Sequence, residues 1–372
     1  MNKRNIGVLT VPINKSGNMP LHNLVDLLSP GADEIYLVTG NDGYSFLKDK
    51  TAHVFGISYR SGKGLITRIL KYLYLQLEIS YLLVRTTRDV GLWVFFFGGE
   101  GLLIPIIALK CLGKKVILVL PGSETQMLKF QRDGIYRIVS LLSGACCSLA
   151  GQIVVYSDKN IGQWGLERYR DKISIAHEHF IDFEKFHAAT DIILRRDVIG
   201  YIGRLREEKG AFEFVKAIPL LLAKKPELEF LIIGEGILSP GILEYIKENG
   251  LEGHVRTLGW VPHATLPRFL NELKLLVIPS ETEGLPNIML EAMACGTPVL
   301  ATPVGAIPDI IVDQQTGFLM EDNSEPCIVR NVLRAVECND LERIVNNSRM
   351  LMEKEFSYSA GVKNYETILK KM

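Results

Sequence analysis

Residues 275–298 read LLVIPSETEGLPNIMLEAMACGTP, and this stretch decides the fold class. The apolar run 275–278 predicts a strand buried on both faces, and a loop containing Gly284 and Pro286 follows it. A short helix is expected over residues 287–295, with Gly296 as its left-handed stop and a proline soon after. A buried strand that leads through a loop into a helix is the repeating element of parallel α/β sheets.

The same alternation continues in both directions from this stretch. Buried strands are expected at residues 6–12, 34–39, 92–97, 115–120 and 152–156, and again at 198–201, 229–233, 255–258, 275–278 and 298–302. Two such series predict two doubly wound parallel-sheet α/β domains. The seam between them is expected at residues 183–197, a polar stretch without a sustained period.

Length and charge bound the function. A chain of 372 residues suits about two domains. Its 42 basic and 42 acidic residues cancel, so the electrostatic footprint of a generic nucleic-acid-binding protein is absent and no nucleic-acid partner is expected. The N-terminal half nonetheless has an excess of basic over acidic residues, and residues 60–115, with 9 basic and 3 acidic residues, account for it. The six cysteines show no metal-site spacing, and we expect them to be reduced in a cytoplasmic protein.

Two apolar stretches raise the question of targeting or membrane segments. The first, near the N-terminus, has only the length of a strand, so no signal peptide is expected. The second, residues 90–109, approaches the length of a membrane span. Glycines at 98, 99 and 101 interrupt it and Pro105 follows, so a buried strand, a glycine turn and a core helix are expected instead.

Two common nucleotide-binding motifs fail in this sequence. The turn Gly234-Glu235-Gly236 lacks the third glycine of the dinucleotide fingerprint, because position 239 is Ser. Gly56 and Gly62-Lys63 stand one residue too far apart for a kinase-type P-loop, and Gly64 replaces the hydroxyl that would bind magnesium. An NAD-dependent dehydrogenase is therefore disfavoured.

The loop of residues 203–210, GRLREEKG, carries residues suited to a diphosphate. It follows an expected strand, and in a parallel sheet such loops lie at the ligand-binding edge. Arg204 and Lys209 are cationic near neutral pH and can meet phosphate oxygens there. A solvated, salt-bridged turn is the alternative, because Glu207 and Glu208 stand beside the cations.

The loop and helix of residues 279–298 offer a second anion site. Free amides and the positive end of the helix favour a phosphate. Glu283 in the loop and Glu291 within the helix are placed to accept hydrogen bonds from sugar and ribose hydroxyls. The alternative leaves Glu291 complementing the helix dipole and Glu283 as an ordinary surface residue.

Together these motifs resemble the retaining glycosyltransferases of family 4. Glu283 and Glu291 are similar to that family's E-x(7)-E pair, residues 203–210 to its G-R-L-x-x-x-K-G loop, and residues 232–236 to its (I/V)-G-(D/E)-G turn. The resemblance is strong over residues 199–320. It implies the GT-B fold, in which two Rossmann-like domains face each other across a cleft.

This fold implies a division of the chain into three parts. Residues 1–187 would form an acceptor-binding domain, and residues 188–355 a nucleotide-sugar-binding domain. Residues 356–372 would form a C-terminal helix that returns to the first domain.

The resemblance also implies a role for each matched residue. Arg204 and Lys209 would neutralise the donor's diphosphate, Glu283 would contact the donor sugar, and these three form the expected catalytic set. Glu291 would bind the ribose. The other implied donor-binding residues are Gly203, Trp260, Val261, Gly284, Leu285 and Asn287. No metal and no other cofactor is implied, since fixed cations act on a donor that is itself a substrate.

The first domain departs from the family pattern. Ser16 and Gly17 stand near the position of a Gly-Gly loop and are the candidates for a phosphate or acceptor loop. Residues 121–123 read Pro-Gly-Ser where many relatives carry a functional histidine. His177 and His179 receive no catalytic role, because a lone histidine is more often structural.

Residues 64–84 predict a helix rich in Leu, Ile and Tyr, with Arg68 and Lys71 near its start. Basic and apolar residues on one helix suit peripheral contact with an anionic membrane at its cytoplasmic face, where a lipid-linked acceptor would lie. The alternative is an ordinary helix packed on its sheet, with its charges in water.

The resemblance thus implies a transferase that moves a hexosyl unit from a nucleotide-sugar to a glycan or lipid-linked glycan in cell-surface polysaccharide assembly. Two alternatives stay open. One is another GT-B activity, such as a nucleotide-sugar epimerase. The other is a catalytically degenerate binding subunit, which would be expected to have lost the cations or the glutamates named above.

Overall fold

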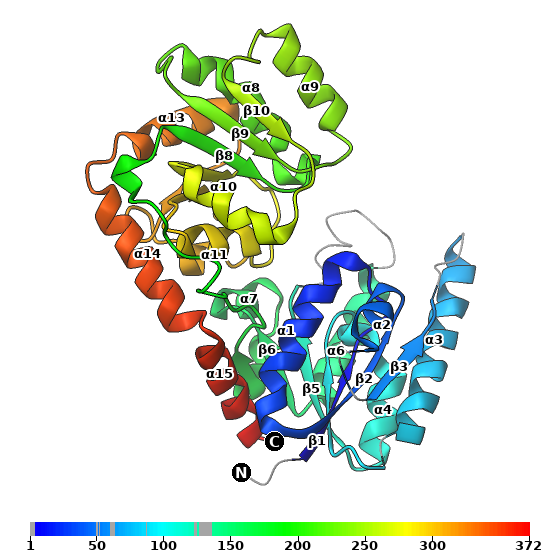
Figure 1. The fold of residues 1–372 in the computed structure, drawn as a ribbon. Helices are drawn as coiled ribbons and strands as arrows, with labels where there is room; N and C mark the ends of the chain where they lie inside the picture. Colours follow the sequence, from blue (N-terminus) through cyan, green and yellow to red (C-terminus); the bar gives the residue numbers. More distant parts are fainter. Residues whose placement is uncertain are drawn as a thin grey trace. The chain divides into compact units, whose positions relative to one another are not determined.

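The computed structural model describes residues 4–49, 51, 53–59, 64–86, 88–122, 125 and 136–372, without the side chains of Ser16 and Leu65. The chain divides into two compact units (Figure 1). Unit 1 comprises Met1–Phe180 and Ser359–Met372, and unit 2 comprises Ile181–Tyr358. The domain boundary expected after residue 187 lies a few residues beyond this division, and the roles given to the domains stay predictions.

Unit 1 contains a parallel sheet with the order β3-β2-β1-β4-β5-β6-β7 in the described part of the chain. Its central strand β1 pairs with β2 on one side and with β4 on the other. The strands are β1 (Arg4–Leu9), β2 (Ala32–Gly40), β3 (His53–Ile57), β4 (Leu92–Phe95), β5 (Lys115–Leu120), β6 (Gln152–Val155) and β7 (Ile173–Ile175).

Unit 2 contains a second parallel sheet, with the order β10-β9-β8-β11-β12-β13. The strands are β8 (Val198–Ile202), β9 (Glu229–Ile233), β10 (Val255–Leu258), β11 (Leu275–Ile278), β12 (Val299–Ala301) and β13 (Phe318–Leu319). In each unit the first strand is central and the order reverses beside it, so the predicted doubly wound class is confirmed twice.

Helices connect the strands in both units. The described helices of unit 1 are η1 (Lys15–Gly17), α1 (Asn18–Leu28), η2 (Ser29–Gly31), α2 (Asp42–Leu47), α3 (Leu65–Thr86), η3 (Gly99–Gly101), α4 (Leu103–Cys111), α6 (Tyr136–Leu149), α7 (Asp158–Gln163), η4 (Glu167–Lys172) and most of α15 (Tyr358–Lys370). Those of unit 2 are η5 (Ile192–Leu194), η6 (Glu207–Lys209), α8 (Ala211–Leu222), α9 (Ser239–Glu248), η7 (His263–Thr265), α10 (Leu266–Glu272), α11 (Asn287–Ala294), α12 (Ile307–Ile310), α13 (Glu325–Val336) and α14 (Leu341–Glu355).

The expected strands all form, most of them as continuous apolar runs buried on both faces of a parallel sheet. The exception is β10, an edge strand in which three of the four residues are half-buried or exposed. The helix expected after β11 is α11, and Gly296 follows it with φ +68°, as predicted for a left-handed stop. Three strands were not predicted: β3, β7 and β13. All three lie at sheet edges, where a strand pairs on one side only.

The apolar stretch of residues 90–109 forms strand β4, the glycine turn η3 and helix α4, as predicted. The helix expected over residues 64–84 is α3. Gln76 on α3 accepts a hydrogen bond of 3.0 Å from the amide of Ile104 in the first turn of α4, so the two helices are joined. Within the described residues, no helix has both the length and the apolar character needed to cross a membrane.

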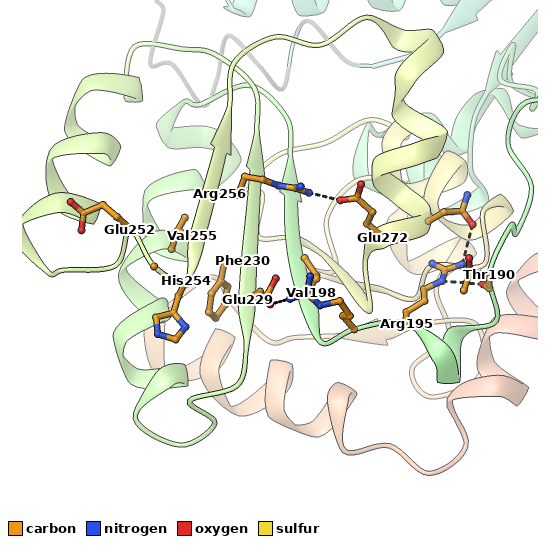
Figure 2. A pocket seen from close by; sticks show the side chains of 13 residues that line it. Thr190, Arg195, Val198, Glu229, Phe230, Glu252, His254, Val255, Arg256 and Glu272 are labelled. Carbon is orange, nitrogen blue, oxygen red and sulfur yellow. Dashed lines mark hydrogen bonds and ion pairs between the residues drawn. The ribbon is translucent and has the colours of Figure 1, made fainter.

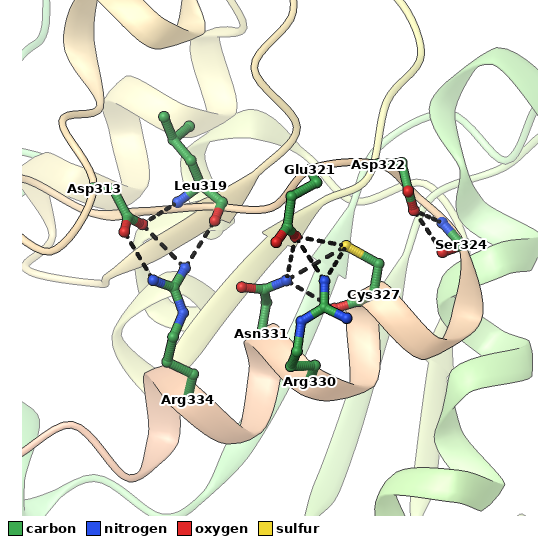
Figure 3. Close-up of polar contacts among 9 residues, drawn as sticks. All are labelled: Asp313, Leu319, Glu321, Asp322, Ser324, Cys327, Arg330, Asn331 and Arg334. Atoms are coloured by element: carbon green, nitrogen blue, oxygen red, sulfur yellow. Dashed lines mark hydrogen bonds and ion pairs between the residues drawn. The ribbon is translucent and has the colours of Figure 1, made fainter.

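Polar contacts fasten helix α13 to the end of the second sheet (Figure 3). Arg334 donates to both carboxylate oxygens of Asp313, at 2.8 and 3.0 Å. Glu321 accepts hydrogen bonds from Cys327 at 3.0 Å and Asn331 at 3.1 Å. These bonds, the one from Cys327 foremost, lower the pKa of Glu321 to about 2. The cluster serves the fold, although Nε of Arg334 is buried without a hydrogen-bond partner.

Candidate functional site

The carboxyl ends of β8 and β11 form the centre of the candidate site. These strands are neighbours, while β9 continues the sheet on one side and β12 on the other. Ligands of open parallel sheets bind at such a reversal, because the loops that follow the two strands leave toward opposite faces. The loops here are residues 203–210 and 279–286, the two stretches singled out in the sequence.

The two loops pack backbone against backbone. The amide of Glu281 donates to the carbonyl of Glu208 at 3.0 Å. Gly210 has φ +64°, and a Cβ built on it would lie 2.0 Å from the carbonyl oxygen of Pro279. Only glycine fits this position, because a side chain would meet both a strained backbone and a fixed carbonyl.

A partly buried ion pair joins the side chains of the two loops. Nζ of Lys209 lies 2.7 Å from Oε1 of Glu283, and the two side chains are 16% and 13% exposed. The same ammonium donates to the carbonyl of Thr282 at 3.3 Å, and the hydroxyl of Ser280 donates to Oε1 of Glu283 at 2.8 Å. An ammonium has three N–H groups, so the contacts described here leave one N–H for a ligand.

Arg204 contributes through both its backbone and its side chain. The buried hydroxyl of Tyr201 donates to the carbonyl of Arg204 at 2.8 Å, which fixes the start of the loop. Burial, together with the negative charge of Glu283, raises the pKa of Tyr201, so this hydroxyl stays protonated and remains a donor. The Arg204 residue itself is exposed, so its guanidinium is accessible at the edge of the sheet.

Glu291 is buried within α11 and contacts an unexpected partner. Its Oε1 lies 2.7 Å from Nε2 of His263, which comes from η7. The side chains are 9% exposed for Glu291 and 62% for His263. The hydrogen bond that the imidazole donates to Glu291 raises the pKa of His263 from its usual value, against an opposing effect of partial burial.

The segment between β10 and η7 carries Trp260 and Val261. Trp260 is 72% exposed, yet its amide donates to Oε1 of Glu235 at 3.1 Å. Val261 is half-buried. The backbone of this segment is therefore tied to the loop after β9, while the indole presents an apolar face to solvent.

The structure thus brings some of the predicted donor-site residues into direct contact. Lys209 and Glu283 touch, and Gly284–Asn287 continue from Glu283 into the first turn of α11. Leu285 in this segment is buried, and the carbonyl of Gly284 accepts from the amide of Ala306 at 2.8 Å. Gly203 lies half-buried at the start of the first loop. The roles of these residues in binding stay predictions.

Four polar residues of this region were missed from the sequence: Tyr201, Glu235, His263 and Ser280. Ser280 lay inside the quoted stretch and had the chemistry of a donor to Glu283. His263 precedes Glu291 by 28 residues, and no spacing rule links the two. Their contact depends on the path of the segment after β10, which the sequence pattern does not specify.

Unit 1 offers less support for a site. Gly17 has φ −83°, an ordinary value, and a Cβ there would lie 3.1 Å from the side chain of Ile13. No special backbone requirement therefore explains this glycine. The side chain of Ser16 and residue 123 lie outside the described residues, so the first-domain loop stays a prediction.

A buried acid lies near the end of β6 in unit 1. The hydroxyl of Tyr156 donates to Oε2 of Glu178, and Nε2 of His179 lies 3.6 Å from Oε1. Glu178 is 1% exposed, and this burial raises its pKa to about 7. Neither His177 nor His179 was assigned a catalytic role, and their contacts here are with this buried cluster.

A pocket of about 440 Å³ lies at the opposite edge of the second sheet, by the first residues of β8, β9 and β10 (Figure 2). Four of its charged side chains pair with one another, Arg196 with Glu229 and Arg256 with Glu272, and Arg195 donates to backbone carbonyls. Such pairs leave little charge for a ligand. The pocket also lies away from the carboxyl edge at which parallel sheets bind ligands, so we place the candidate site at the loops.

Comparison with known proteins agrees with this geometry. The family model for glycosyl transferases group 1 matches residues 182–350. The uncharacterized glycosyltransferase MJ1178 of Methanocaldococcus jannaschii is 30% identical over 155 residues, which are 41% of this chain and 44% of that protein. The amylovoran biosynthesis glycosyltransferase AmsK of Erwinia amylovora is 28% identical over 200 residues, 52% of this chain and 49% of that protein. The chain therefore matches just under half the length of these curated relatives.

Comparison with solved structures shows a similarity of fold over nearly the whole chain. The crystal structure of HepE from Anabaena in complex with UDP has a TM-score of 0.80 to this chain at 15% identity. The match covers 99% of this chain and 100% of that one. The chain has the GT-B fold, and residues 182–350, which lie in its second unit, match the model of the group 1 glycosyl transferases.

Proposed function

We propose that this chain is a retaining glycosyltransferase that moves a hexosyl unit from a nucleotide-sugar to a glycan or lipid-linked glycan. The observation that carries the proposal is the Lys209–Glu283 ion pair at the reversal of the second sheet, within the residues that match the family. A cation and an acid side by side suit a ligand that carries both phosphate and sugar hydroxyls.

Each end of the donor has a partner in this arrangement. The free N–H of Lys209, the exposed guanidinium of Arg204 and the first amides of α11 would hold the diphosphate. Glu283, already oriented by Ser280, would accept from a hydroxyl of the donor sugar. Glu291 would accept from the ribose, and the indole of Trp260 would border the base.

The chemistry proposed is a substitution at the anomeric carbon of the sugar. The bond from that carbon to the diphosphate oxygen breaks, and its electron pair leaves with the nucleoside diphosphate. The acceptor oxygen forms the new bond on the same face, and its proton passes to the departing phosphate oxygen. Lys209, already held by Glu283, and the exposed Arg204 would stabilise the negative charge that develops there.

No metal and no other cofactor enters this proposal, because the two cations supply the positive charge on the leaving group. Activity should therefore persist when divalent cations are chelated. A complete loss of activity in a chelator, restored by adding a divalent ion, would show that the cations of this loop are insufficient.

For the biological role we propose the assembly of cell-surface polysaccharide at the cytoplasmic face of a membrane. The glycosyltransferase CapM of Staphylococcus aureus, which is 28% identical to this chain over 191 residues, is named for the biosynthesis of capsular polysaccharide, and this similarity supports that role. The acceptor would then be a growing glycan or its lipid-linked precursor.

Helix α3 supports peripheral contact with an anionic membrane. One face packs inward through Leu75, Ile79 and Leu83. Eight other large apolar side chains are between 40% and 74% exposed, namely Ile66, Ile69, Leu70, Leu73, Tyr74, Leu77, Tyr81 and Val84. Arg68, Lys71 and Arg85 lie on the same helix. Exposed apolar area beside basic residues favours the surface of an anionic bilayer, with about 1 kcal/mol from each cation near it.

Flotation with vesicles tests the membrane contact. The full chain should float at low salt with vesicles that contain phosphatidylglycerol. A protein carrying both Leu70→Gln and Leu77→Gln should stay at the bottom, whereas the control Leu243→Gln, at an exposed leucine of unit 2, should float. Wild-type protein that stays at the bottom would rule the contact out.

The competing functions make different predictions. A nucleotide-sugar epimerase would convert the donor without an acceptor. A degenerate binding subunit would bind a donor without turnover, although Arg204, Lys209, Glu283 and Glu291 are all present.

The proposal is tested by release of nucleoside diphosphate from UDP-, GDP- and ADP-sugars, with acceptor glycans present and absent. Lys209→Met should lower kcat/KM by about a hundredfold or more, because it removes a charged group from the leaving phosphate. Lys247→Met, at an exposed lysine on α9, is the matched control and should match the wild type. Equal rates for Lys209→Met and wild type would refute the assignment.

A further inference from the structure

The contact between His263 and Glu291 has no role in the function proposed so far. Nε2 of the imidazole lies 2.7 Å from Oε1 of the carboxylate, within the range of a charge-assisted hydrogen bond. The acid is almost buried in α11, whereas most of the imidazole is open to solvent. The contact therefore joins a fixed helix to the short element η7 that follows the Trp260 segment.

Among the residues that the structure describes, three side chains are placed near the imidazole. Glu291 approaches it from α11, and the ring of Phe186 lies with its centroid 5.3 Å away. The third is Lys185, whose positive charge opposes protonation of the imidazole but which is itself bound to Asp182 at 2.5 Å. The hydrogen bond to Glu291 outweighs these effects and raises the pKa of His263. The imidazole therefore keeps its positive charge to a higher pH than an unperturbed histidine does.

We propose that His263 is a positioning residue for the nucleotide, which holds Oε1 of Glu291 so that Oε2 is presented to the ribose hydroxyls of a nucleoside diphosphate. This inference rests on the proposed function. A glutamate side chain has several rotatable bonds, and freezing them costs conformational free energy when a ligand binds. A carboxylate that is already held does not incur this cost during binding, so affinity rises.

The arrangement also links nucleotide affinity to pH. At a pH below the pKa of His263, the imidazole is cationic and its hydrogen bond to Glu291 is charge-assisted. At a pH above that pKa, the neutral imidazole keeps one N–H but has lost its charge. The affinity should therefore decrease as the pH rises through the pKa of His263, which lies above the usual 6.5. Glutamine at this position could donate a hydrogen bond from its amide but could not titrate.

Calorimetric titration of the full chain with UDP, GDP or ADP tests the proposal, using whichever nucleotide binds the wild type most tightly. His263→Ala should weaken binding about tenfold, as expected for the loss of one hydrogen bond to a charged group. His263→Gln should stay within about threefold of the wild type at a pH above the pKa of His263, where the imidazole is as uncharged as the glutamine amide. The matched control is His187→Gln, at an exposed histidine of the same unit.

The pH profile separates positioning from a merely structural role. From about pH 6 to about pH 8.5 the wild type should lose about threefold in affinity relative to His263→Gln. This ratio cancels the titration of the nucleotide's own phosphate, which is common to both proteins. Parallel profiles, or binding unchanged in His263→Ala, would overturn the role of His263 while the proposed function stands. If none of the three nucleotides binds the wild type, the proposed function fails and this inference fails with it.

Discussion

Substituting Ala for Gly210 tests whether the two loops pack as closely as the structure shows. The new Cβ would lie 2.0 Å from the carbonyl oxygen of Pro279, in a backbone with φ +64°. The positive φ alone costs about 1–2 kcal/mol in a residue other than glycine. Relief of the overlap by movement of the loops adds about 1–3 kcal/mol, the range of overpacked sites. The expected loss of stability is about 2–5 kcal/mol.

Gly250→Ala is the matched control, because Gly250 has φ +63° and no atom within 4 Å of the added Cβ. It should show the backbone cost alone, about 1–2 kcal/mol. In thermal unfolding of a unit this size, about 1 kcal/mol lowers Tm by about 2–4 °C. Gly210→Ala should therefore unfold at a clearly lower temperature than Gly250→Ala, and its affinity for nucleoside diphosphate should also drop. Equal Tm values for the two variants would refute the close packing of the loops.

Three further predictions follow from single contacts. Ser280→Ala removes a donor to Oε1 of Glu283 and should lower kcat/KM by about tenfold in steady-state kinetics, the effect expected for one hydrogen bond to a charged group. A decrease below about twofold would contradict this role of Ser280. Burial raises the pKa of Glu178 from 4.5 to about 7, so the free energy of unfolding should decline by on the order of 3 kcal/mol as the pH rises from 4.5 through 7. Urea unfolding should show this decline in the wild type, and an equal decline in Glu178→Gln would exclude Glu178 as its source. Arg195→Met leaves the carbonyls of Leu273 and Cys295 without their buried donor and should lower the free energy of unfolding by at least about 3 kcal/mol, as measured by thermal unfolding. A decrease below about 1 kcal/mol would show that water or a local shift replaces the guanidinium as donor.

The central strands could be predicted from the sequence, because a strand that is buried on both faces is a continuous apolar run. The edge strands do not obey this rule. In β3, four of the five residues are half-buried or exposed, and Gly56 lies within the strand. A short, partly exposed run of this kind cannot be told from a loop by composition alone, since its pairing with β2 is a tertiary contact.

For the site, the sequence predicted which loops matter, and the sheet order explains why they meet. Lys209 and Glu283 are far apart in the chain, yet both follow strands that are neighbours at the reversal of the sheet. The partner of Glu291 could not be predicted in this way. His263 belongs to a segment whose backbone is held by the hydrogen bond between Glu235 and the amide of Trp260. The spacing of apolar and polar residues in the sequence does not predict that bond.

The central claim is that a nucleoside diphosphate binds at the loops that follow β8 and β11. A crystal structure of the full chain with the tightest-binding of UDP, GDP and ADP tests it most directly. The account predicts diphosphate oxygens within hydrogen-bond distance of Lys209 and of the first amides of α11, with the ribose against Glu291. A nucleotide seated elsewhere, for example beside Arg196 and Arg256 at the opposite edge of the sheet, would contradict it.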